Sequence, residues 1–468
     1  MVFEKIIKKK IDYNNLTLMC KDIPVANIEM VKGTPIVKQI YEKELFPTLI
    51  NESDKEKIEN NLNQWMRTRC IPGARTNIIT TLSKLNMRST IELSCKAMGI
   101  SLNDQYWYKP KNLSISWDKI NPYKNGFSND LGDIMFDPML NTVSVDLVSP
   151  DATTNGVDPK RWILDNNNQA YLMKTNSHSE QVACNEMLAS EMCRRLGIRS
   201  VVYNKIRKDI MLPDAQGDFY KRNCLFAVSK NFCDENHRFV SAHTYKCNCL
   251  GVGEKEFVRD VLMYSQFKED IGKMIVLDFL ISNEDRHYHN FGFLFDENGN
   301  VELAPIFDSG NSMFYNEEQR LIGGHETYSS IAPTYKEALE LAFTRPSDFD
   351  WYDSFVLEGI DEYFKNIMKD TDISKEKQEM LCKYLNSRIK ELDQYIQNFK
   401  ENYCDIDEVL SGLTEIDDNN ASGYKINNGR VVLTSENAKN ECRHLLETKQ
   451  IASVNQYPAY LNAKNNER

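Results

Sequence analysis

The chain lacks any hydrophobic run long enough to cross a membrane. Among its 468 residues, no window approaches the roughly 18 uncharged apolar residues of a membrane span. The start, MVFEKIIKKKIDY, has lysines but not the apolar core that a secretion signal needs behind its basic residues. We therefore expect a cytoplasmic protein without a membrane partner, in which KIIKKK is a solvated face or a strand edge.

An excess of positive charge is also missing. The 57 Lys and Arg residues are outnumbered by 68 Asp and Glu residues, which gives a net charge of -11. This balance argues against direct nucleic-acid binding through a broad basic face, although a local basic groove remains possible. Without a secretion signal, the 12 cysteines are expected to be reduced thiols rather than a disulfide framework.

What the chain contains is the composition of a globular protein, with 41% hydrophobic and 27% charged residues. Its length exceeds one ordinary core and predicts about three domains or subdomains. The changes of pattern along the chain predict four regions: an accessory region with a small β element and helices (1–125), a mixed α/β lobe (126–232), a helical lobe (233–402) and a polar C-terminal extension (403–468).

The accessory region combines strand and helix patterns. IPVANIEMVKGTPIVKQIY has the Val and Ile content and the Gly-Thr-Pro punctuation of a strand pair. Residues 57–100 carry apolar positions at helical spacing, broken at Pro72 and Gly73, and predict helices. Residues 107–146 are aromatic and rich in turn residues, and predict a connection between units.

An amphipathic helix is predicted from Ser177 to Leu196, after a strand, a turn and a second strand. Ser177 and Glu180 fit a capping box, and Gly197 fits the helix end. Glu186 shares a helix face with apolar residues, namely Val182, Ala189 and Cys193. A carboxylate that faces inward needs a partner.

The helical lobe contains one interruption. Helices are predicted at 257–281, 336–344, 353–368 and 375–399. Between the first two, FGFLF, DENGN and VELAPIF predict a β-hairpin, with Asn298 and Gly299 at its turn.

Three polar residues surround this hairpin at a meaningful spacing. Asp285 and Asn290 are five residues apart, as in the catalytic loop of protein kinases, and Asp308 follows the hairpin. Phosphoryl transfer needs one carboxylate to accept a hydroxyl proton, and an amide oxygen and a second carboxylate to hold cations on the ATP phosphates. Turn and cap residues around a hairpin are the simpler alternative.

Further parts of a phosphoryl-transfer site come in the expected order upstream. Gly156 lies in a turn that could cover phosphates, and Lys160 is a further phosphate contact. Lys174, on a strand, could be the cation that binds the phosphates, with the inward Glu186 as the partner that holds it in place. An ordinary salt bridge between the two is the alternative. The strand CLFAVSKNF is suitable as a hinge, with Val228 and Phe232 as its nucleotide contacts.

The segments NEDRHYHNFGF and APIFDSGNS resemble the catalytic region of the HipA-like serine/threonine kinases, which share D-R-H-x-x-N with phosphoinositide kinases. WMRTRCIPGARTN and SLNDQYW also resemble N-terminal segments of HipA-domain proteins from Gram-positive bacteria. The resemblance implies an α+β, bilobal protein-kinase-like fold that uses ATP and Mg²⁺. It implies these roles: Asp285 as catalytic base, Asn290 and Asp308 as magnesium ligands, Lys174 as the ATP lysine and Glu186 as its partner.

The resemblance also implies regulation and partners. A phosphate loop of this family can be autophosphorylated and then leaves the site, and Thr153, Thr154 and Ser149 lie in that position here. The best-known relatives are toxins that act on the translation machinery, such as aminoacyl-tRNA synthetases, and are held by a small helix-turn-helix antitoxin. The alternatives are a small-molecule or lipid kinase and a catalytically silent nucleotide-binding module.

Histidines and cysteines near the catalytic segment leave other interpretations open. We expect His287, beside the cofactor site, to be a packing residue that orients the loop rather than a metal ligand. No role is assigned to His289. A structural zinc site is a weaker alternative for the residues of CDENHRFVSAHTYKCNC, namely Cys233, His237, His243, Cys247 and Cys249.

Overall fold

The computed structural model describes most of the chain as two compact units. The described residues are 11–48, 54–141, 144–316, 328–403, 424–427, 430–433, 436–447 and 457. The first unit comprises Met1–Phe343 and Trp351–Glu391, and the second comprises Thr344–Asp350 and Leu392–Arg468. The basic start, KIIKKK, lies outside the described residues. No helix in the described part of the chain is long and apolar enough to span a membrane.

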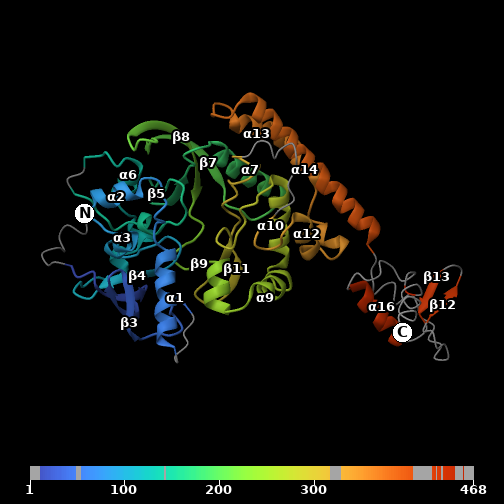
Figure 1. The fold of residues 1–468 in the computed structure, drawn as a ribbon, viewed down its shortest axis with the longest axis horizontal. Coiled ribbons are helices and arrows are strands. Elements are labelled where there is room, and N and C mark those ends of the chain that lie inside the picture. Colours follow the sequence, from blue (N-terminus) through green and yellow to red (C-terminus); the bar gives the residue numbers. More distant parts are fainter. Residues whose placement is uncertain are drawn as a thin grey trace. The chain divides into compact units, whose positions relative to one another are not determined.

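An antiparallel four-stranded sheet forms the first part of the accessory region. Its order is β3-β2-β1-β4, with β1 (Asn15–Cys20), β2 (Ile23–Val31), β3 (Thr34–Ile40) and β4 (Tyr106–Pro110). Helix α1 (Lys55–Thr68) lies beside this sheet in Figure 1 and buries Leu62 and Trp65 in the same core. The predicted strand pair is confirmed as β2 and β3.

The predicted helical segment is confirmed as three helices, α1, α2 (Ile78–Lys84) and α3 (Thr90–Lys96), with the break around Pro72 and Gly73. The prediction of a plain connection at 107–146 is wrong. This segment holds most of β4 and three short helices, α4 (Trp117–Ile120), α5 (Pro122–Asn125) and α6 (Asp130–Phe136). Strand β4 is almost wholly buried, so it shows no alternation of polar and apolar residues that would reveal a strand.

A second antiparallel sheet forms the mixed α/β lobe. Its order is β5-β6-β8-β7, with β5 (Lys160–Leu164), β6 (Ala170–Lys174), β7 (Tyr203–Pro213) and β8 (Phe219–Lys230). A short 3-10 helix, η1 (Pro150–Thr153), precedes it. The core of this lobe includes Met173 and Phe226 together with Ile78 and Leu93 of the accessory helices.

Helix α7 (Gln181–Leu196) follows β6 and is buried along most of its length. It ends at Gly197 in a left-handed conformation (φ +67°), as predicted. The predicted capping box is wrong, because the helix begins at Gln181 and Glu180 is its N-cap residue without a side-chain cap. The Glu180 carboxylate instead accepts hydrogen bonds from outside the helix, which are described with the site below.

The helical lobe contains a small sheet and four longer helices. The predicted hairpin is confirmed as β10 (Gly292–Phe295) and β11 (Val301–Leu303), and β9 (Arg238–Ser241) extends it to order β11-β10-β9. The helices are α10 (Lys268–Ile281), α12 (Tyr335–Ala342), α13 (Ile360–Met368) and α14 (Lys375–Asn402). The helix predicted at 257–281 is broken into a π-helix, η3 (Phe257–Met263), and α10. Shorter turns complete the lobe: α8 (Ala242–Thr244), η2 (Tyr245–Leu250), α9 (Glu254–Glu256) and η5 (Ser354–Leu357).

The second unit contains η4 (Pro346–Phe349), the end of α14, a strand pair β12 (Tyr424–Asn427) and β13 (Arg430–Leu433), and α16 (Glu436–Glu447). Within it, Phe349 packs against Phe399, with ring centroids 5.8 Å apart. The boundaries of the four regions stay a prediction.

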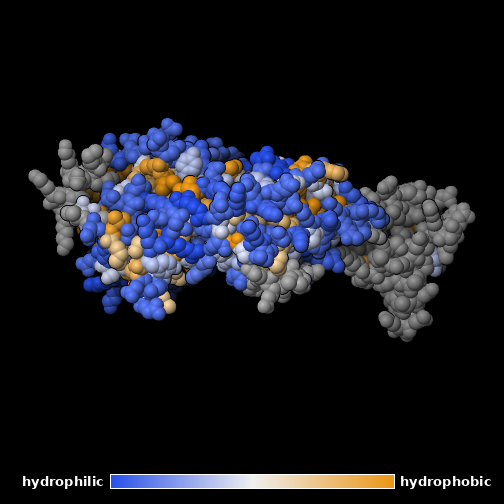
Figure 2. Space-filling model, turned by 90° about the horizontal axis from the view of Figure 1, so that it is seen from above, coloured by the Kyte–Doolittle hydropathy of each residue, from blue (hydrophilic) through white to orange (hydrophobic). Residues whose placement is uncertain are grey.

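The fold class is confirmed: an α/β lobe precedes a mainly helical lobe with an inserted hairpin, the arrangement of a protein-kinase-like fold. The face seen in Figure 2 is mainly hydrophilic, with small scattered hydrophobic groups among the coloured residues. Charged side chains are buried inside the first unit, among them Asp151, Glu186 and Arg286.

Candidate functional site

Arg286 organises the loop between α10 and β10. Its side chain is fully buried and donates to both carboxylate oxygens of Asp278, with Nε–Oδ2 and Nη2–Oδ1 distances of 3.0 Å. It also donates to the backbone oxygens of Asn290 (2.7 Å) and Phe307 (2.6 Å) and to Ser309 Oγ (2.8 Å). Burial alone would lower the pKa of Arg286, but Asp278 reverses this and raises it. One guanidinium therefore joins the loop that carries Asp285 to the segment that carries Asp308.

Asp285 and Asn290 lie together at the end of this loop. Asn290 Nδ2 donates to the backbone oxygen of Asp285 at 2.8 Å and to its Oδ2 at 3.4 Å, and Asn311 Nδ2 donates to the same Oδ2 at 2.9 Å. The other oxygen, Oδ1, lies 3.7 Å from His287 Nε2. The Asp285 side chain is 40% exposed and lines the cleft. Its carboxylate is held on one side and open on the other.

Lys174 joins the α/β lobe to Asp308. It forms ion pairs with Glu186 of α7 and with Asp308, whose Oδ1 is 2.6 Å from Lys174 Nζ. Burial disfavours the charged form of Lys174, but Asp308 and Glu186 outweigh this and hold its pKa well above the ordinary value. Burial alone would raise the pKa of Asp308, but Lys174 and Lys160 bring it below its ordinary value. The carboxylate therefore stays ionised. The partner required by the inward Glu186 is thus Lys174.

A second ammonium group lies under the glycine turn. Lys160 faces Lys174 across the β5–β6 register, and a Cβ built on Gly156 would overlap its Nζ. Gly156 has φ +91°, a conformation that favours glycine. The side chain of Lys160 makes no hydrogen bond or ion pair with any residue in the described ranges. Burial lowers the pKa of Lys160 to about 8, although Asp308 opposes the shift.

These groups line one cleft of about 900 Å³. It is lined by both lobes and by the accessory region, whose contribution includes Trp65, Arg69 and Tyr106. Phe232 lines it as predicted and stacks on Phe307, with ring centroids 5.6 Å apart. The predicted nucleotide contact of Val228 is wrong, because this side chain is buried in the lobe core. Its neighbours Ala227 and Ser229 line the cleft instead. Adjacent strand residues point to opposite faces, so the prediction named the wrong one.

The three candidate phosphorylation residues are all buried. Thr153 Oγ1 donates to the backbone oxygen of Ile100 at 2.8 Å, and Thr154 Oγ1 donates to that of Asp151 at 2.9 Å. Ser149 is fully buried, and its Oγ is 3.3 Å from Asp151 Oδ2. Thr153 and Thr154 line the cleft, whereas Ser149 does not.

The histidines and cysteines are arranged differently from the predictions. His287 is not a packed residue: its side chain is 47% exposed and lines the cleft, and the buried Arg286 orders the loop instead. His289 stacks on His243, with centroids 4.3 Å apart.

Residues of the possible zinc set do not converge. Cys233 is buried and its Sγ donates to the backbone oxygen of His237 at 2.9 Å, while Cys247 lies 3.8 Å from His243 Nε2. Within the described ranges, no three or more His, Cys, Asp or Glu side chains form a group suited to a metal ion. The side chain of Cys249 is outside the described set.

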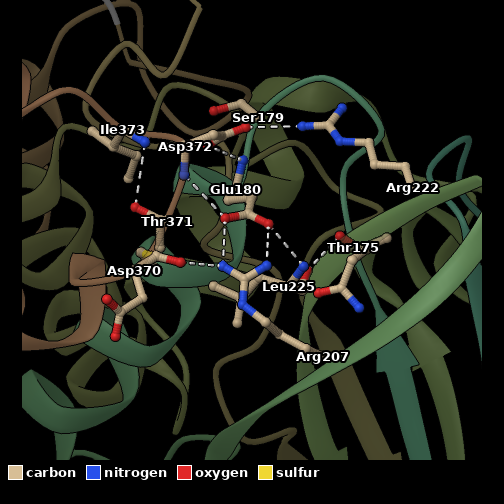
Figure 3. Close-up of polar contacts among 12 residues, drawn as sticks. Thr175, Ser179, Glu180, Arg207, Arg222, Leu225, Asp370, Thr371, Asp372 and Ile373 are labelled. Carbon is tan, nitrogen blue, oxygen red and sulfur yellow. Dashed lines mark hydrogen bonds and ion pairs between the residues drawn. The ribbon is translucent and has the colours of Figure 1, made fainter.

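Glu180 fixes the start of α7 (Figure 3). Its carboxylate accepts two hydrogen bonds from Arg207 of β7, both at 2.8 Å. It also accepts the N–H groups of Leu225 in β8 and Asp372 after α13, both at 3.1 Å. Arg222 reaches the same segment through Asp372 Oδ2 at 2.9 Å. The α/β lobe and the helical lobe are therefore joined at the helix that carries Glu186.

The next residues of α7 hold the segment after Asp308. Gln181 Nε2 donates to the backbone oxygen of Met313 at 3.2 Å. Asn185 Nδ2 donates to those of Gly310 (2.9 Å) and Ser312 (2.8 Å). Glu186 Oε2 accepts the N–H of Ser309 at 3.1 Å. Sequence reasoning missed Gln181 and Asn185, although polar residues on a helix that is otherwise apolar were a usable signal.

Comparisons with known proteins support this assignment of the fold. Residues 255–377 match the model of the HipA-like C-terminal domain. HipA of Shewanella oneidensis MR-1, solved with HipB and operator DNA, is 12% identical with a TM-score of 0.51, and the match covers 82% of this chain and 99% of that one. The Helicobacter pylori proinflammatory kinase CtkA is 18% identical with a TM-score of 0.38, covering 51% of this chain and 94% of that one. No curated protein matches. The resemblance to HipA-like kinases is confirmed.

Asp278→Asn should destabilise the first unit by about 3–5 kcal/mol, because it leaves the buried Arg286 charge without its carboxylate. Urea unfolding followed by tryptophan fluorescence measures this, since all 5 tryptophans lie in that unit. Asp270→Asn, on the exposed face of the same helix, is the matched control and should cost less than about 1 kcal/mol. Equal effects of the two variants would contradict the role given to Arg286.

Glu180→Gln should lower the free energy of unfolding by about 1–3 kcal/mol, because the hydrogen bonds to Arg207 lose their charge and Arg207 is partly exposed to solvent. The same unfolding assay applies. Glu302→Gln removes a comparable ion pair with Arg199, in which both side chains are 52% exposed, and should change the stability by less than about 0.5 kcal/mol. A Glu180 variant as stable as the wild type would show that the lobes do not depend on this contact.

Proposed function

We propose that this chain is an ATP- and Mg²⁺-dependent serine/threonine protein kinase of HipA-like type. The observation that carries the proposal is the cluster of Lys174, Glu186 and Asp308, which opens into the same cleft as Asp285. Phosphoryl transfer needs a fixed cation on the phosphates, a partner that holds the cation, and a base on the acceptor side. The match of residues 255–377 to the HipA-like domain supports the same conclusion.

We assign to Asp285 the position beside the hydroxyl group that receives the phosphate. Asn290 and Asn311 hold its Oδ2, which leaves Oδ1 open toward the cleft. The oxygen of a Ser or Thr hydroxyl would attack the γ-phosphorus, ADP would leave, and the hydroxyl proton would pass to Asp285. Because the carboxylate is already oriented, its contribution is positioning as much as basicity.

The phosphates are assigned to the opposite wall. Lys174 is kept charged by Asp308 and Glu186, and Lys160 brings a second ammonium group without a partner in the described structure. A phosphate chain would supply the counter-charge that Lys160 lacks, with the Gly156 turn over it. Phe232 and Ala227 would contact the nucleoside at the hinge.

Asp308 and Asn290 fit a magnesium ion. Asn290 uses its Nδ2 on Asp285, so its amide oxygen is left as an acceptor, and the ionised Asp308 is 38% exposed toward the cleft. Oxygen donors of this kind are those that Mg²⁺ prefers. When bound, the ion would neutralise charge on the phosphate oxygens.

Autophosphorylation of Thr153, Thr154 or Ser149 is part of the proposal. Their hydroxyls are buried and hydrogen-bonded, and a phosphate adds up to about two negative charges that such sites cannot accept. Modification would therefore require the loop to leave its place, which would also remove the Gly156 turn from the ATP site. The loop would then act as a self-inhibitory switch.

The physiological role that we propose is a toxin component with a protein substrate in the translation machinery, such as an aminoacyl-tRNA synthetase. A small helix-turn-helix antitoxin would be its partner. The support is the fold shared with HipA, which was solved together with HipB and operator DNA. A short helix-turn-helix reading frame beside the gene would strengthen this part of the proposal.

Asp285→Asn should reduce phosphoryl transfer about 10²–10⁴-fold while ATP affinity stays within about threefold, because only the proton acceptor is lost. Intact-mass spectrometry after incubation with ATP and Mg²⁺, with peptide mapping of 149–154, measures self-modification, and casein and an inositol lipid serve as acceptors. Asp218→Asn, a change of the same charge at an exposed residue, is the control.

Three outcomes would contradict the proposed kinase. Transfer to the lipid alone would favour the lipid-kinase alternative. Binding of ATP without any transfer would favour the silent nucleotide-binding module. Wild type that neither gains phosphate nor binds ATP in the presence of Mg²⁺ would exclude nucleotide chemistry at this site.

Lys160→Met should weaken ATP binding about tenfold and leave adenosine binding unchanged, because the lost charge would contact the phosphates and not the nucleoside. Isothermal titration calorimetry with both ligands measures this. Lys221→Met, on the exposed edge of the same lobe, removes an equal charge and should affect neither ligand. Equal weakening of ATP and adenosine would show that Lys160 supports the fold of the cleft rather than the phosphates.

A further inference from the structure

Arg75 lies behind the glycine turn and comes from the accessory region. Its guanidinium donates to Thr154 Oγ1 (2.9 Å) and to three consecutive backbone oxygens: those of Thr154 (2.8 Å), Asn155 (2.8 Å) and Gly156 (2.6 Å). The N–H of the next residue, Thr76, donates to the backbone oxygen of Val157 at 3.4 Å. Four successive carbonyl groups of the loop are thus tied to one point of the accessory region.

Burying the charge of Arg75 without an ion pair is energetically unfavourable, which indicates a role beyond packing. Arg75 is 3% exposed and makes no ion pair in the described structure, so its buried charge is balanced only by neutral oxygens and by more distant carboxylates. Burial lowers the pKa of Arg75 to about 9, and Asp151 and Asp158 oppose the shift only partly. Buried charges are expensive unless they are paired. An apolar residue would fill this position at lower cost if only packing were required.

The tied carbonyl groups determine where the loop N–H groups point. In a planar trans peptide, the N–H of each residue points opposite to the C=O of the residue before it. The N–H groups of residues 155–158 therefore project away from Arg75. Arg75 does not line the cleft, whereas Asn155, Gly156, Val157 and Asp158 do.

These N–H groups are available to a ligand. In the described part of the chain, nothing accepts a hydrogen bond from the N–H groups of Asn155, Val157 and Asp158. The N–H of Gly156 donates to the exposed Oδ1 of Asn155 at 2.7 Å, an acceptor that an anion could replace. A row of outward N–H groups is a typical binding surface for phosphate oxygens.

We infer that Arg75 is a positioning residue that holds the loop of residues 154–157 in its phosphate-binding conformation. This inference rests on the proposed function, because the anion is taken to be the phosphate chain of ATP. Arg75 does not touch the nucleotide. It acts through the loop, and it makes the ATP site depend on the accessory region.

Two measurements on the full-length chain test the inference, with Arg75→Met, Arg75→Lys and Arg388→Met as variants. Arg388 is a second buried arginine that donates to a backbone oxygen, that of Phe279, in the helical lobe, so its loss controls for general destabilisation. The first measurement is amide hydrogen exchange, without nucleotide, at Thr76 and Thr154, whose N–H groups donate to the backbone oxygens of Val157 and Asp151. The second is calorimetric affinity for ATP, ADP and adenosine.

Arg75→Met should speed exchange at Thr76 and Thr154 and weaken the binding of ATP and ADP about tenfold or more, while adenosine, which has no phosphates, binds as it does to wild type. Arg75→Lys should be intermediate, because one ammonium group cannot satisfy the four acceptors of the guanidinium. Arg388→Met should leave exchange in the loop and both nucleotide affinities unchanged.

Unchanged ATP affinity in Arg75→Met would overturn the inference. Equal weakening of ATP and adenosine would also overturn it, because a loss of fold rather than of loop position would then be the cause. If wild type binds no ATP, the proposed function fails, and the exchange measurement alone decides whether Arg75 holds the loop. Faster exchange at Thr76 and Thr154 in Arg75→Met would support this role, and unchanged exchange would contradict it.

Discussion

The buried ammonium group of Lys174 is the constraint on which the rest of the site depends. A charge in this position must be paired, and it is shared between Glu186 of α7 and Asp308 of the segment after the hairpin. Strand β6 and helix α7, which are consecutive in the chain, must therefore meet the distant segment of Asp308 at one point. Asp308 itself has a left-handed conformation (φ +58°), which is uncommon for residues other than glycine and is tolerated where the surroundings determine it strongly.

Contacts of α7 fix the position of the segment that carries Asp308. Glu180, Gln181, Asn185 and Glu186 form a row of side-chain contacts that runs from the lobe junction in Figure 3 to the segment after Asp308. Arg286 holds the other side of that segment through Phe307 and Ser309. Because both sides are fixed by buried hydrogen bonds, the ion pair of Lys174 and Glu186 is already assembled without a nucleotide. Control of activity is then more easily exerted on the glycine loop than on α7.

The sequence was informative wherever a role depends on local spacing. The five-residue separation of Asp285 and Asn290, the inward position of Glu186 and the Asn298–Gly299 turn are all readable without the fold. Val228, His287 and β4 were misjudged because their orientation depends on which strand face or loop side is buried, and that is decided by partners far along the chain. Arg75 and Arg286 were missed for a related reason. Many of their acceptors are backbone oxygens, which cannot be recognised from the residue type.

The accessory region belongs to the same compact unit as the two lobes. Ile78 and Leu93 of its helices share a hydrophobic core with Met173 and Phe226 of the second sheet, so the predicted boundary near residue 125 divides residues of one core. Trp65 and Tyr106 line the same cleft as the catalytic loop. Removal of this region would expose apolar surface of the α/β lobe and take away one wall of the cleft. A mutation there can therefore change the shape of the cleft without replacing a residue that lines it.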